Sequence, residues 1–552
     1  MIRIRTIREF LWQIAEQYGM ADAYSWDNNE TIVNKSYLDL NEDVTKLARE
    51  MHRLFGEQHK IAIIGDTSYI YMCTFFGIIV SANIAVPMDV KSQKQEIISR
   101  LNFADVSVVM LSDKYSDLEE DIINSCRKVD RVLSLENFIH NIPSISEKEV
   151  LSVVYPDQVS VMLFTSGTTG NGYKAAMLTQ DGVLSSIKRY VPLYRPGDKV
   201  LSILPIHHCF DLCYGQLKAL YSGCTIYIND SMANLMKNLS KFKITSIVAV
   251  PAIANLLCSI IENNKGKSVN EIRPLIGGYL QRITIGGAPV NAKTIEVLES
   301  VNVQVFNGYG LTETCGGVLF NANPKINPES CGVPCAYNLD MKIADDGELC
   351  LRGPAIMSGY YKQPELTNKV IIDGWFHTGD MAQITEDNCV VITGRKDNMI
   401  KLSSGEKICP EKWEDKIEKI EGVTAVMVCA FNDHLVAVIY SKDISEVIKE
   451  FVTNSINKLN LDVPGYEKIS DIRFREKPFP VTSSMKIRRS IIIKELSETD
   501  NTNEYIPPQN NIQAGILVQV KRILSSVEKI SITDNLYDLG LDSLGTLELS
   551  VN

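Results

Sequence analysis

The sequence contains no CxxC pair, no GxxxxGK[ST] phosphate loop and no apolar N-terminal stretch of the kind that directs secretion. Its thirteen cysteines are therefore interpreted as reduced thiols, not as disulfides. The histidines of HHCFDLC (207–213) lack a second ligand pair at a metal-binding spacing, so we expect no zinc there. Charges run throughout the N-terminal segment MIRIRTIREF, which predicts a cytoplasmic protein.

An excess of positive charge is also absent. The 552 residues include 56 Lys and Arg against 67 Asp and Glu, a net charge of −11, which argues against a nucleic-acid-binding protein. The longest apolar stretch, residues 69–86, is broken by Thr74, Ser81 and Asn83 and is followed by Pro87. It predicts a buried helix that runs into a strand, so we expect no membrane partner.

The order of apolar segments indicates more than one domain. Strand-like segments alternate with helix-like segments up to about residue 393, which is typical of a layered α/β domain. A small α+β unit follows, and then a polar, proline-containing stretch that is typical of a linker. We assign a large N-terminal domain, a small C-terminal domain, a linker and a further helical segment to residues 1–396, 397–498, 499–511 and 512–552.

The segment FTSGTTGNGYKAAM (164–177) places hydroxyl and glycine residues between two apolar, strand-like segments. Glycines allow the backbone to approach a ligand closely, and hydroxyl and N–H groups offer hydrogen bonds to an anion. The segment therefore favours a phosphate cradle, with a flexible surface hairpin as the alternative.

The segment NGYGLTET (307–314) carries side chains suited to a nucleotide and a metal. Tyr309 can stack on a purine, Thr312 can donate a hydrogen bond to a phosphate, and Glu313 can bind Mg²⁺ through oxygen. An ordinary strand followed by a turn is the alternative.

Three later segments add polar groups to this inventory. WFHTGD (375–380) ends in an aspartate suited to a ribose diol, and GRKDNMIK supplies Arg395 as a donor. PVTSSMKIRR (480–489) offers Lys486, for which a solvated surface charge is the alternative.

Taken together and in order, these five segments resemble the signatures of the acyl-adenylate-forming enzymes, which include acyl-CoA synthetases and the adenylation domains of nonribosomal peptide synthetases. The resemblance covers residues 1–498. It implies an α/β fold with a large N-terminal domain and a small α+β lid. It also implies an AMP-forming acid–thiol ligase that uses ATP and Mg²⁺: a carboxylate attacks the α-phosphate, and a thiol then attacks the acyl-adenylate.

The resemblance implies a role for each matching residue. Thr312 and Lys486 would act at the α-phosphate, Glu313 would bind Mg²⁺, and Asp397 would be the hinge of the lid. The β- and γ-phosphates would be bound by Thr165, Ser166, Gly167, Thr168, Thr169, Gly170 and Lys174. Adenine would be bound by Asn307 and Tyr309, and the ribose by Asp380 and Arg395. His208 would be a further catalytic residue. The acid would be bound by Cys209, Asp211, Gly286, Gly287 and Gly310.

Two details depart from the family pattern. The phosphate loop reads TTGNGYKAA where the family usually has TTGxPKGV, so it has one extra residue and no proline. Met485 stands before Lys486 in place of the usual glycine.

The lid rotation implied by the resemblance would withdraw Lys486 and bring the strand around Ser404 and Gly405 to the site.

A second resemblance lies near the end of the chain. YDLGLDSLGTLEL resembles the attachment site of a carrier protein, in which Ser543 would receive 4′-phosphopantetheine; residues 512–552 would then be a truncated carrier domain. The leading hypothesis is a ligase that loads a carboxylic acid onto its own carrier for downstream assembly-line modules. The alternatives are an acyl-CoA synthetase that uses free CoA, an amino-acid adenylation domain, and a binding module without turnover.

The acid is expected to be fatty or aryl and to lack an α-amino group. Amino-acid-activating relatives pair the substrate ammonium with an aspartate in the segment that matches LPIHHCFDLCYGQL (204–217). Alignment on His208 puts Cys209 at this position and Asp211 where acyl-CoA synthetases usually have glycine. A one-residue gap would restore Asp211, so both registers stay open. A cysteine cannot neutralise a buried ammonium, which favours an acid without an amine.

Overall fold

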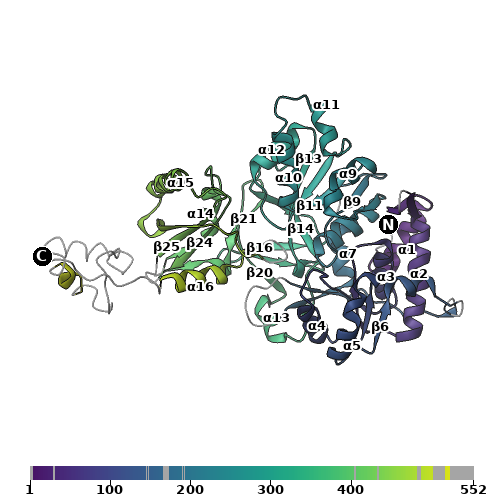
Figure 1. Cartoon of the computed structure of the whole chain (residues 1–552). Coiled ribbons are helices and arrows are strands. Elements are labelled where there is room, and N and C mark those ends of the chain that lie inside the picture. Colours follow the sequence, from purple (N-terminus) through teal and green to yellow (C-terminus); the bar gives the residue numbers. More distant parts are fainter. Residues whose placement is uncertain are drawn as a thin grey trace. The chain divides into compact units, whose positions relative to one another are not determined.

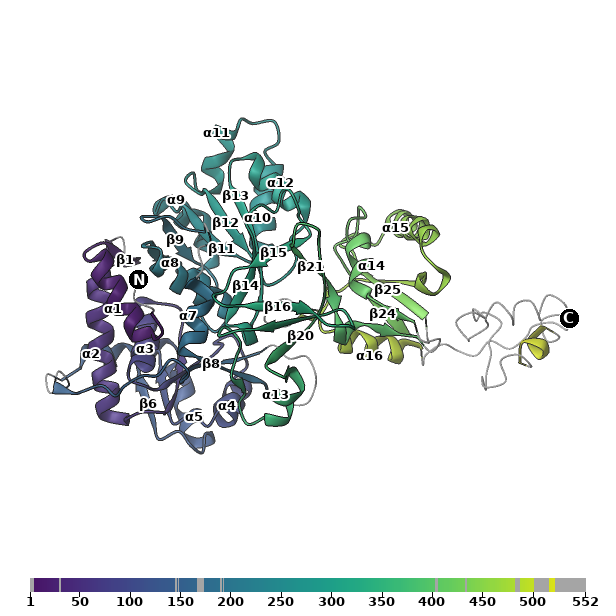
Figure 2. The ribbon, with the colours of Figure 1, turned by 180° about the vertical axis from the view of Figure 1, so that it is seen from behind.

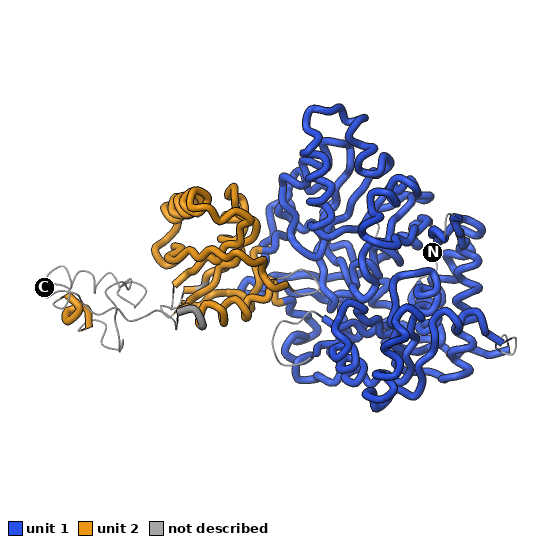
Figure 3. Tube along the Cα trace, in the orientation of Figure 1, with its two compact units in different colours: residues 1–378, 382–392 blue, residues 379–381, 393–552 orange. Residues whose placement is uncertain are grey.

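The computed structural model describes residues 4–28, 31–143, 146, 148–165, 173–188, 191, 193–402, 406–431, 434–481, 487–500 and 516–521. The chain divides into two compact units (Figure 3). The first comprises residues 1–378 and 382–392, and the second comprises residues 379–381 and 393–552. A large N-terminal α/β unit and a smaller C-terminal unit confirm the predicted fold class. A carrier domain is not evident, because only residues 516–521, which are helical, are described beyond residue 500.

The larger sheet is mixed and runs in the order β16-β17-β20-β21-β15-β14-β13-β12-β11-β9-β10-β1-β2, with β19 paired to β20. Its strands from β1 and β10 to β13 pair in parallel, whereas β13 and β14 are antiparallel. Its strands are β1 (Asp22–Asn28), β2 (Thr31–Ser36), β9 (Lys199–Ser202), β10 (Thr225–Ile228), β11 (Ser246–Ala249), β12 (Arg282–Ile285), β13 (Gln304–Leu311), β14 (Gly316–Asn321), β15 (Ser330–Pro334), β16 (Asp340–Ile343), β17 (Glu348–Arg352), β19 (Ile371–Ile372), β20 (Trp375–Ile384) and β21 (Val390–Arg395).

The second sheet of the first unit has the order β18-β8-β7-β4-β3-β5-β6. Parallel pairing holds from β7 to β6, whereas β8 pairs antiparallel with both β7 and β18. Its strands are β3 (Lys60–Ile64), β4 (Ile84–Pro87), β5 (Val108–Leu111), β6 (Arg131–Ser134), β7 (Val159–Phe164), β8 (Ala175–Thr179) and β18 (Gly359–Tyr360).

Helices cover the two sheets of the first unit. The helices α1, α2 and α3 contact one another and lie side by side in both views (Figures 1 and 2). The helices are α1 (Ile7–Tyr18), α2 (Tyr37–Phe55), α3 (Tyr69–Val80), α4 (Lys94–Phe103), α5 (Glu119–Ser125), α6 (Leu135–His140), α7 (Gln180–Lys188), α8 (Ala219–Tyr221), α9 (Leu235–Lys241), α10 (Pro251–Glu262), α11 (Val269–Ile272), α12 (Ala292–Ser300) and α13 (Pro364–Val370).

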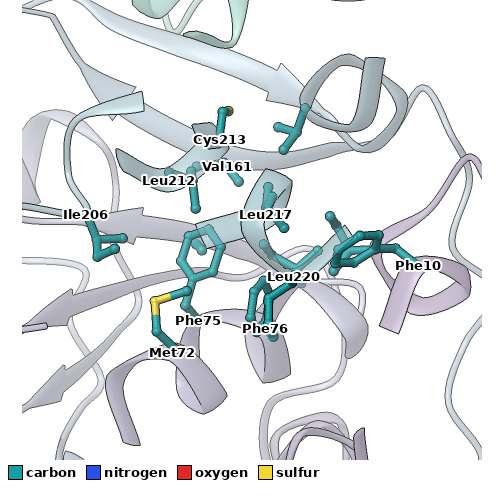
Figure 4. Packing of buried hydrophobic residues seen from close by; sticks show 14 of the residues in the cluster. Phe10, Met72, Phe75, Phe76, Val161, Ile206, Leu212, Cys213, Leu217 and Leu220 are labelled. Carbon is teal, nitrogen blue, oxygen red and sulfur yellow. The ribbon is translucent and has the colours of Figure 1, made fainter. Parts of the chain in front are cut away.

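The apolar segment at residues 69–86 is a buried helix followed by a strand, as the sequence predicts. It forms α3 and β4, and almost every residue of α3 is buried. Phe75 and Phe76 of α3 lie among apolar side chains that include Leu217 and Leu220 (Figure 4). No helix of the described residues is both long and apolar enough to cross a bilayer.

The second unit contains the three-stranded sheet β24-β25-β26 and the short pair β22-β23. Arg489, the first residue of α16, forms an ion pair with Glu414 of α14 at 2.5 Å and donates to the Val428 carbonyl at 2.9 Å. These contacts attach the last residue of PVTSSMKIRR to α14 and to β24. The elements are β22 (Ile400–Lys401), β23 (Lys407–Ile408), α14 (Pro410–Ile417), β24 (Ala425–Phe431), β25 (His434–Tyr440), α15 (Glu446–Leu459), β26 (Ile469–Arg475) and α16 (Arg489–Asp500).

Two adjacent leucines of α10 differ in burial, so their alanine variants test how the core of the first unit is packed. Leu257 is fully buried between α10 and the sheet, whereas Leu256 is 46% exposed. We expect Leu257→Ala to lower the free energy of unfolding by about 2–5 kcal/mol, because it removes buried apolar surface and leaves a cavity. Leu256→Ala should cost less than about 1 kcal/mol. Denaturant unfolding of the two variants measures this difference, and equal losses would contradict the packing described.

Candidate active site

The threonine- and glycine-rich segment connects β7 to β8, which form an antiparallel pair. Phe164 pairs with Ala175 in the antiparallel ladder. The Thr165 amide then donates to the Lys174 carbonyl at 2.9 Å, which closes the hairpin at the base of the loop. Thr165 and Lys174 therefore stand on its two sides. The other predicted phosphate ligands lie outside the described residues: Ser166, Gly167, Thr168, Thr169 and Gly170.

The NGYGLTET segment forms the end of β13 and the sharp turn Thr312–Thr314. At Gly310 a Cβ atom would lie 1.9 Å from the Gly316 carbonyl oxygen, so only glycine fits. The Thr314 hydroxyl donates to the same carbonyl at 2.7 Å, which braces the turn. The turn thereby presents Thr312 and Glu313, both half-buried, just beyond the end of β13.

The residues predicted to hold adenine lie along the same strand. Asn307 is buried, and its amide donates to a neighbouring backbone carbonyl at 3.3 Å, while Tyr309 packs half-buried against a core cluster. Gly286 and Gly287 follow the end of the adjacent strand, β12. A Cβ atom on Gly286 would lie 2.8 Å from the Phe210 ring, so glycine allows this ring to approach the strand.

Cys209 lies at the turn that carries Thr312. Its thiol donates to the Leu311 carbonyl at 3.6 Å, and its sulfur is 3.9 Å from the Thr312 hydroxyl. Burial raises the pKa of the Cys209 thiol to about 12, so it is an uncharged group at neutral pH. Cys209 leads into the π-helix Asp211–Lys218, which packs against the turn and β14.

The two adjacent histidines are neutral. The ring centroids of His207 and His208 are 4.3 Å apart, and the His207 Nε2 is 3.7 Å from the Asp89 carboxylate. Burial is the main cause that lowers the pKa of His207 to about 3, and it also lowers the pKa of His208. Both rings are therefore uncharged near pH 7. Among the described residues, no three His, Cys, Asp or Glu side chains are grouped to hold a metal.

Asp211 belongs to a different cluster, which is polar and buried. Its Oδ2 accepts hydrogen bonds from Ser202 at 3.2 Å and from Gln216 at 3.1 Å, and Tyr24 donates to Gln216. Its Oδ1 has no partner among the described residues and lies against Gly215, where a Cβ atom would be 2.2 Å away. Burial raises the pKa of Asp211 to about 7. The described contacts therefore join Cys209, and not Asp211, to Thr312.

The predicted ribose and hinge residues lie in the second unit. Arg395 donates to the Asp380 carboxylate at 2.8 Å, and Asp380 is buried. Asp397 is exposed in the short turn Lys396–Asn398, which separates β21 from β22. Three predicted residues of this unit and the predicted carrier serine lie outside the described residues: Ser404, Gly405, Lys486 and Ser543.

Tyr360 was not identified from the sequence, yet it links two of the predicted motifs. Its hydroxyl donates to the Glu313 Oε1 at 2.7 Å, and the Lys174 ammonium lies 5.9 Å from the centroid of its ring. Tyr360 lies in β18, at the edge of the second sheet, whereas Glu313 follows β13 of the larger sheet. The two residues are 47 positions apart in the sequence, and no local motif predicts their contact.

Two family models match this chain over both units. The model described as AMP-binding enzyme matches residues 11–361, and the model of its C-terminal domain matches residues 397–499. The chain belongs to the AMP-binding enzyme family. The predicted superfamily is thereby confirmed, as is the prediction of an AMP-forming ligase.

Relatives of this AMP-binding enzyme agree in fold. A long-chain-fatty-acid–CoA ligase of Mycobacterium bovis is 25% identical over 524 residues, covering 79% of this chain and 86% of the relative. An anthranilate CoA ligase structure in complex with anthranoyl-AMP covers 90% of this chain and 98% of its own, with a TM-score of 0.76 and 18% identity. A structure titled McyG A-PCP covers 99% of this chain and 94% of its own, with a TM-score of 0.74 and 20% identity.

Asp211 gives the AMP-binding enzyme a pH-dependent stability. The folded state keeps this carboxyl protonated up to about pH 7, whereas the unfolded chain ionises it near its ordinary value of 3.8. Its stabilising contribution is thus full below about pH 4 and is lost as pH rises through 7. We expect the stability of the wild type relative to Asp211→Asn to fall by up to roughly 4 kcal/mol between pH 4 and pH 8.

Denaturant unfolding at several pH values measures this difference. Asp345→Asn, at an exposed position, is the matched control and should differ from the wild type by the same amount at every pH. A difference between wild type and Asp211→Asn that does not change with pH would contradict the burial of an ionisable carboxyl at this place.

Proposed function

We propose that the protein activates a fatty or aryl carboxylic acid with ATP and Mg²⁺ and transfers the acyl group to the thiol of CoA. The observation that carries the proposal is the meeting of the phosphate-loop hairpin with the Thr312–Thr314 turn, through Lys174, Tyr360 and Glu313. Two motifs that are distant in sequence, each suited to phosphate or metal, lie together in one unit. This is the arrangement that adenylation of a carboxylate requires.

The turn after β13 supplies the polar groups for the α-phosphate. The Thr312 hydroxyl would donate to it, and Glu313 would bind Mg²⁺. Glu313 fits this ion because its carboxylate is half-buried, and the hydrogen bond from Tyr360 uses Oε1 and leaves Oε2 for the metal. Mg²⁺ prefers oxygen ligands and usually combines one or two carboxylates with phosphate oxygens and water. When bound, it would offset charge on the phosphates of ATP.

The resemblance suggests a residue for each other part of the nucleotide. Asn307 and Tyr309 would hold adenine, and Asp380 and Arg395 the ribose diol. Thr165, Lys174 and the loop between them would hold the β- and γ-phosphates. Lys486 would bridge the attacking carboxylate and the α-phosphate. A rotation about Asp397 would then exchange Lys486 for the segment around Gly405, so that one site serves both half-reactions.

The proposal that the acid lacks an amino group is based on Cys209. This neutral thiol lies beside Thr312. In the register without a gap, Cys209 takes the position where amino-acid-activating relatives have an aspartate. Asp211, the alternative anchor, bonds to Ser202 and Gln216 instead. Asp211 is therefore not placed to neutralise a substrate ammonium beside Thr312, and an ammonium buried there without a carboxylate partner would cost several kcal/mol in desolvation.

Free CoA is favoured over a carrier domain as the acceptor. The sequence alone led us to prefer transfer to a carrier within the same chain, but the matched curated relative is a long-chain-fatty-acid–CoA ligase. The comparisons therefore support the alternative hypothesis better. The carrier hypothesis rests on the DSL segment at Ser543, which lies outside the described residues.

Acid-dependent exchange of pyrophosphate into ATP tests the first half-reaction. We expect exchange with long-chain fatty or aryl acids, weak exchange with the 2-amino counterpart of the best acid, and an acyl-CoA product once CoA is added. The variant Ser543→Ala should form acyl-CoA at the wild-type rate. A preference for the amino acid that is lost in Asp211→Ala would overturn the proposed acid class, and acylation of Ser543 without any acyl-CoA would overturn the proposed acceptor.

The variant Lys486→Ala tests the two lid positions. We expect it to lower adenylate formation by at least about 100-fold, because the lysine would stabilise charge only while the carboxylate attacks the α-phosphate. Thioester formation from a supplied acyl-adenylate should stay near the wild-type rate. Single-turnover assays of the two half-reactions measure this, and an equal loss in both would contradict a separate role for the lysine.

A further inference from the structure

Tyr360 occupies a place that no sequence motif assigned. Its backbone is fixed from several directions: β18 pairs with β8, so that Tyr360 lies opposite Ala176, and its amide donates to the Thr367 hydroxyl at 2.9 Å. The flanking amides of Ser358 and Tyr361 donate to β8 carbonyls, each at 2.9 Å. This segment therefore has little freedom, and the phenol reaches Glu313 from a rigid base.

The Glu313 side chain, in contrast, stands on a short turn. Its own carbonyl accepts a hydrogen bond from the Met357 amide at 2.8 Å, so the backbone of the turn is attached to the segment that carries Tyr360. Among the described residues, Tyr360 is the hydrogen-bond donor to the Glu313 carboxylate. Without this bond the carboxylate could rotate about its side-chain torsions.

We propose that Tyr360 is a positioning residue that orients the Glu313 carboxylate for the Mg²⁺ that accompanies ATP. This proposal rests on the metal-binding role proposed for Glu313. A hydrogen bond from a neutral donor to one carboxylate oxygen fixes the plane of the group and directs the other oxygen to the metal. Loss of such an outer-shell partner typically lowers metal affinity by about 10- to 100-fold.

Tyr360 also contacts the ammonium of Lys174. Its ring lies 5.9 Å from the Lys174 ammonium, at the base of the phosphate-loop hairpin. The aromatic ring can attract this cation while its hydroxyl binds the carboxylate. Tyr360 thus contacts both the cation at the base of the hairpin and the carboxylate of the turn.

The variant Tyr360→Phe tests the proposal, because it keeps the ring and removes only the hydroxyl. ATP binding is measured by calorimetry without any acid, so that no turnover occurs, once with excess Mg²⁺ and once with a chelator. The wild type should bind ATP more tightly with Mg²⁺. We expect Tyr360→Phe to reduce this Mg²⁺-dependent gain by about 10-fold or more and to leave binding without Mg²⁺ unchanged. Tyr360→Met, a second variant without the hydroxyl, should show the same loss.

Tyr361→Phe is the matched control. The neighbouring phenol donates to the Asp105 carboxylate at 2.8 Å, so this variant also loses a bond between a tyrosine and a carboxylate. It should keep the full Mg²⁺-dependent gain. The proposal would be overturned if Tyr360→Phe kept the wild-type increase in ATP affinity with Mg²⁺. It would also be overturned if Tyr361→Phe lost as much of this increase as Tyr360→Phe.

A double-mutant cycle shows whether Tyr360 acts through Glu313. Glu313→Gln should itself reduce the Mg²⁺-dependent gain, and adding Tyr360→Phe should cause no further loss. Additive losses would overturn the proposed route. Failure of the proposed function is a distinct outcome: it would appear as an absence of acid-dependent pyrophosphate exchange in the wild type, whatever the Mg²⁺ dependence of ATP binding.

Discussion

The close approach of β13 and β14 is the constraint on which the site depends. No side chain fits at Gly310, because the Gly316 carbonyl occupies the place of its Cβ atom. The next glycine along β14, Gly317, is covered by the Tyr214 ring, and the hydroxyl of that ring donates to its carbonyl at 2.8 Å. These contacts bring the π-helix against the strands at one point. The chain must turn sharply there, and this turn carries Thr312 and Glu313.

The same corner connects the two sheets of the first unit. One sheet contributes the turn after β13, and the other contributes β8, β18 and the hairpin loop between β7 and β8. Neither sheet alone places a hydroxyl, a carboxylate and an ammonium together. The hydrogen bonds from Tyr360 and from the Met357 amide to Glu313 link them directly, so the geometry of these groups depends on how the sheets pack.

Much of the fold follows from local patterns, because burial imposes them directly. The helix at α3 and the strand at β4 were predicted from an apolar run interrupted by small polar residues, and strands such as β12 and β17 from short apolar segments. The grouping of strands into two sheets was not predictable, since pairing depends on contacts between distant segments. Tyr360 was missed for the same reason, whereas the resemblance of motifs assigned roles at the α-phosphate and at Mg²⁺ to Thr312 and Glu313 without any knowledge of the sheets.

The base of the phosphate-loop hairpin explains how this chain tolerates a longer loop. The bond between Thr165 and Lys174 closes the hairpin. The register of the ladder beyond it is fixed, because a one-residue slip would exchange Ala175 and Ala176, which are buried in different apolar clusters. An extra residue between the two strands would therefore cost little, because the entropy of loop closure grows slowly with residue number. A change in the number of residues between Thr165 and Lys174 would thus leave Lys174 and the strand that pairs with β18 in place.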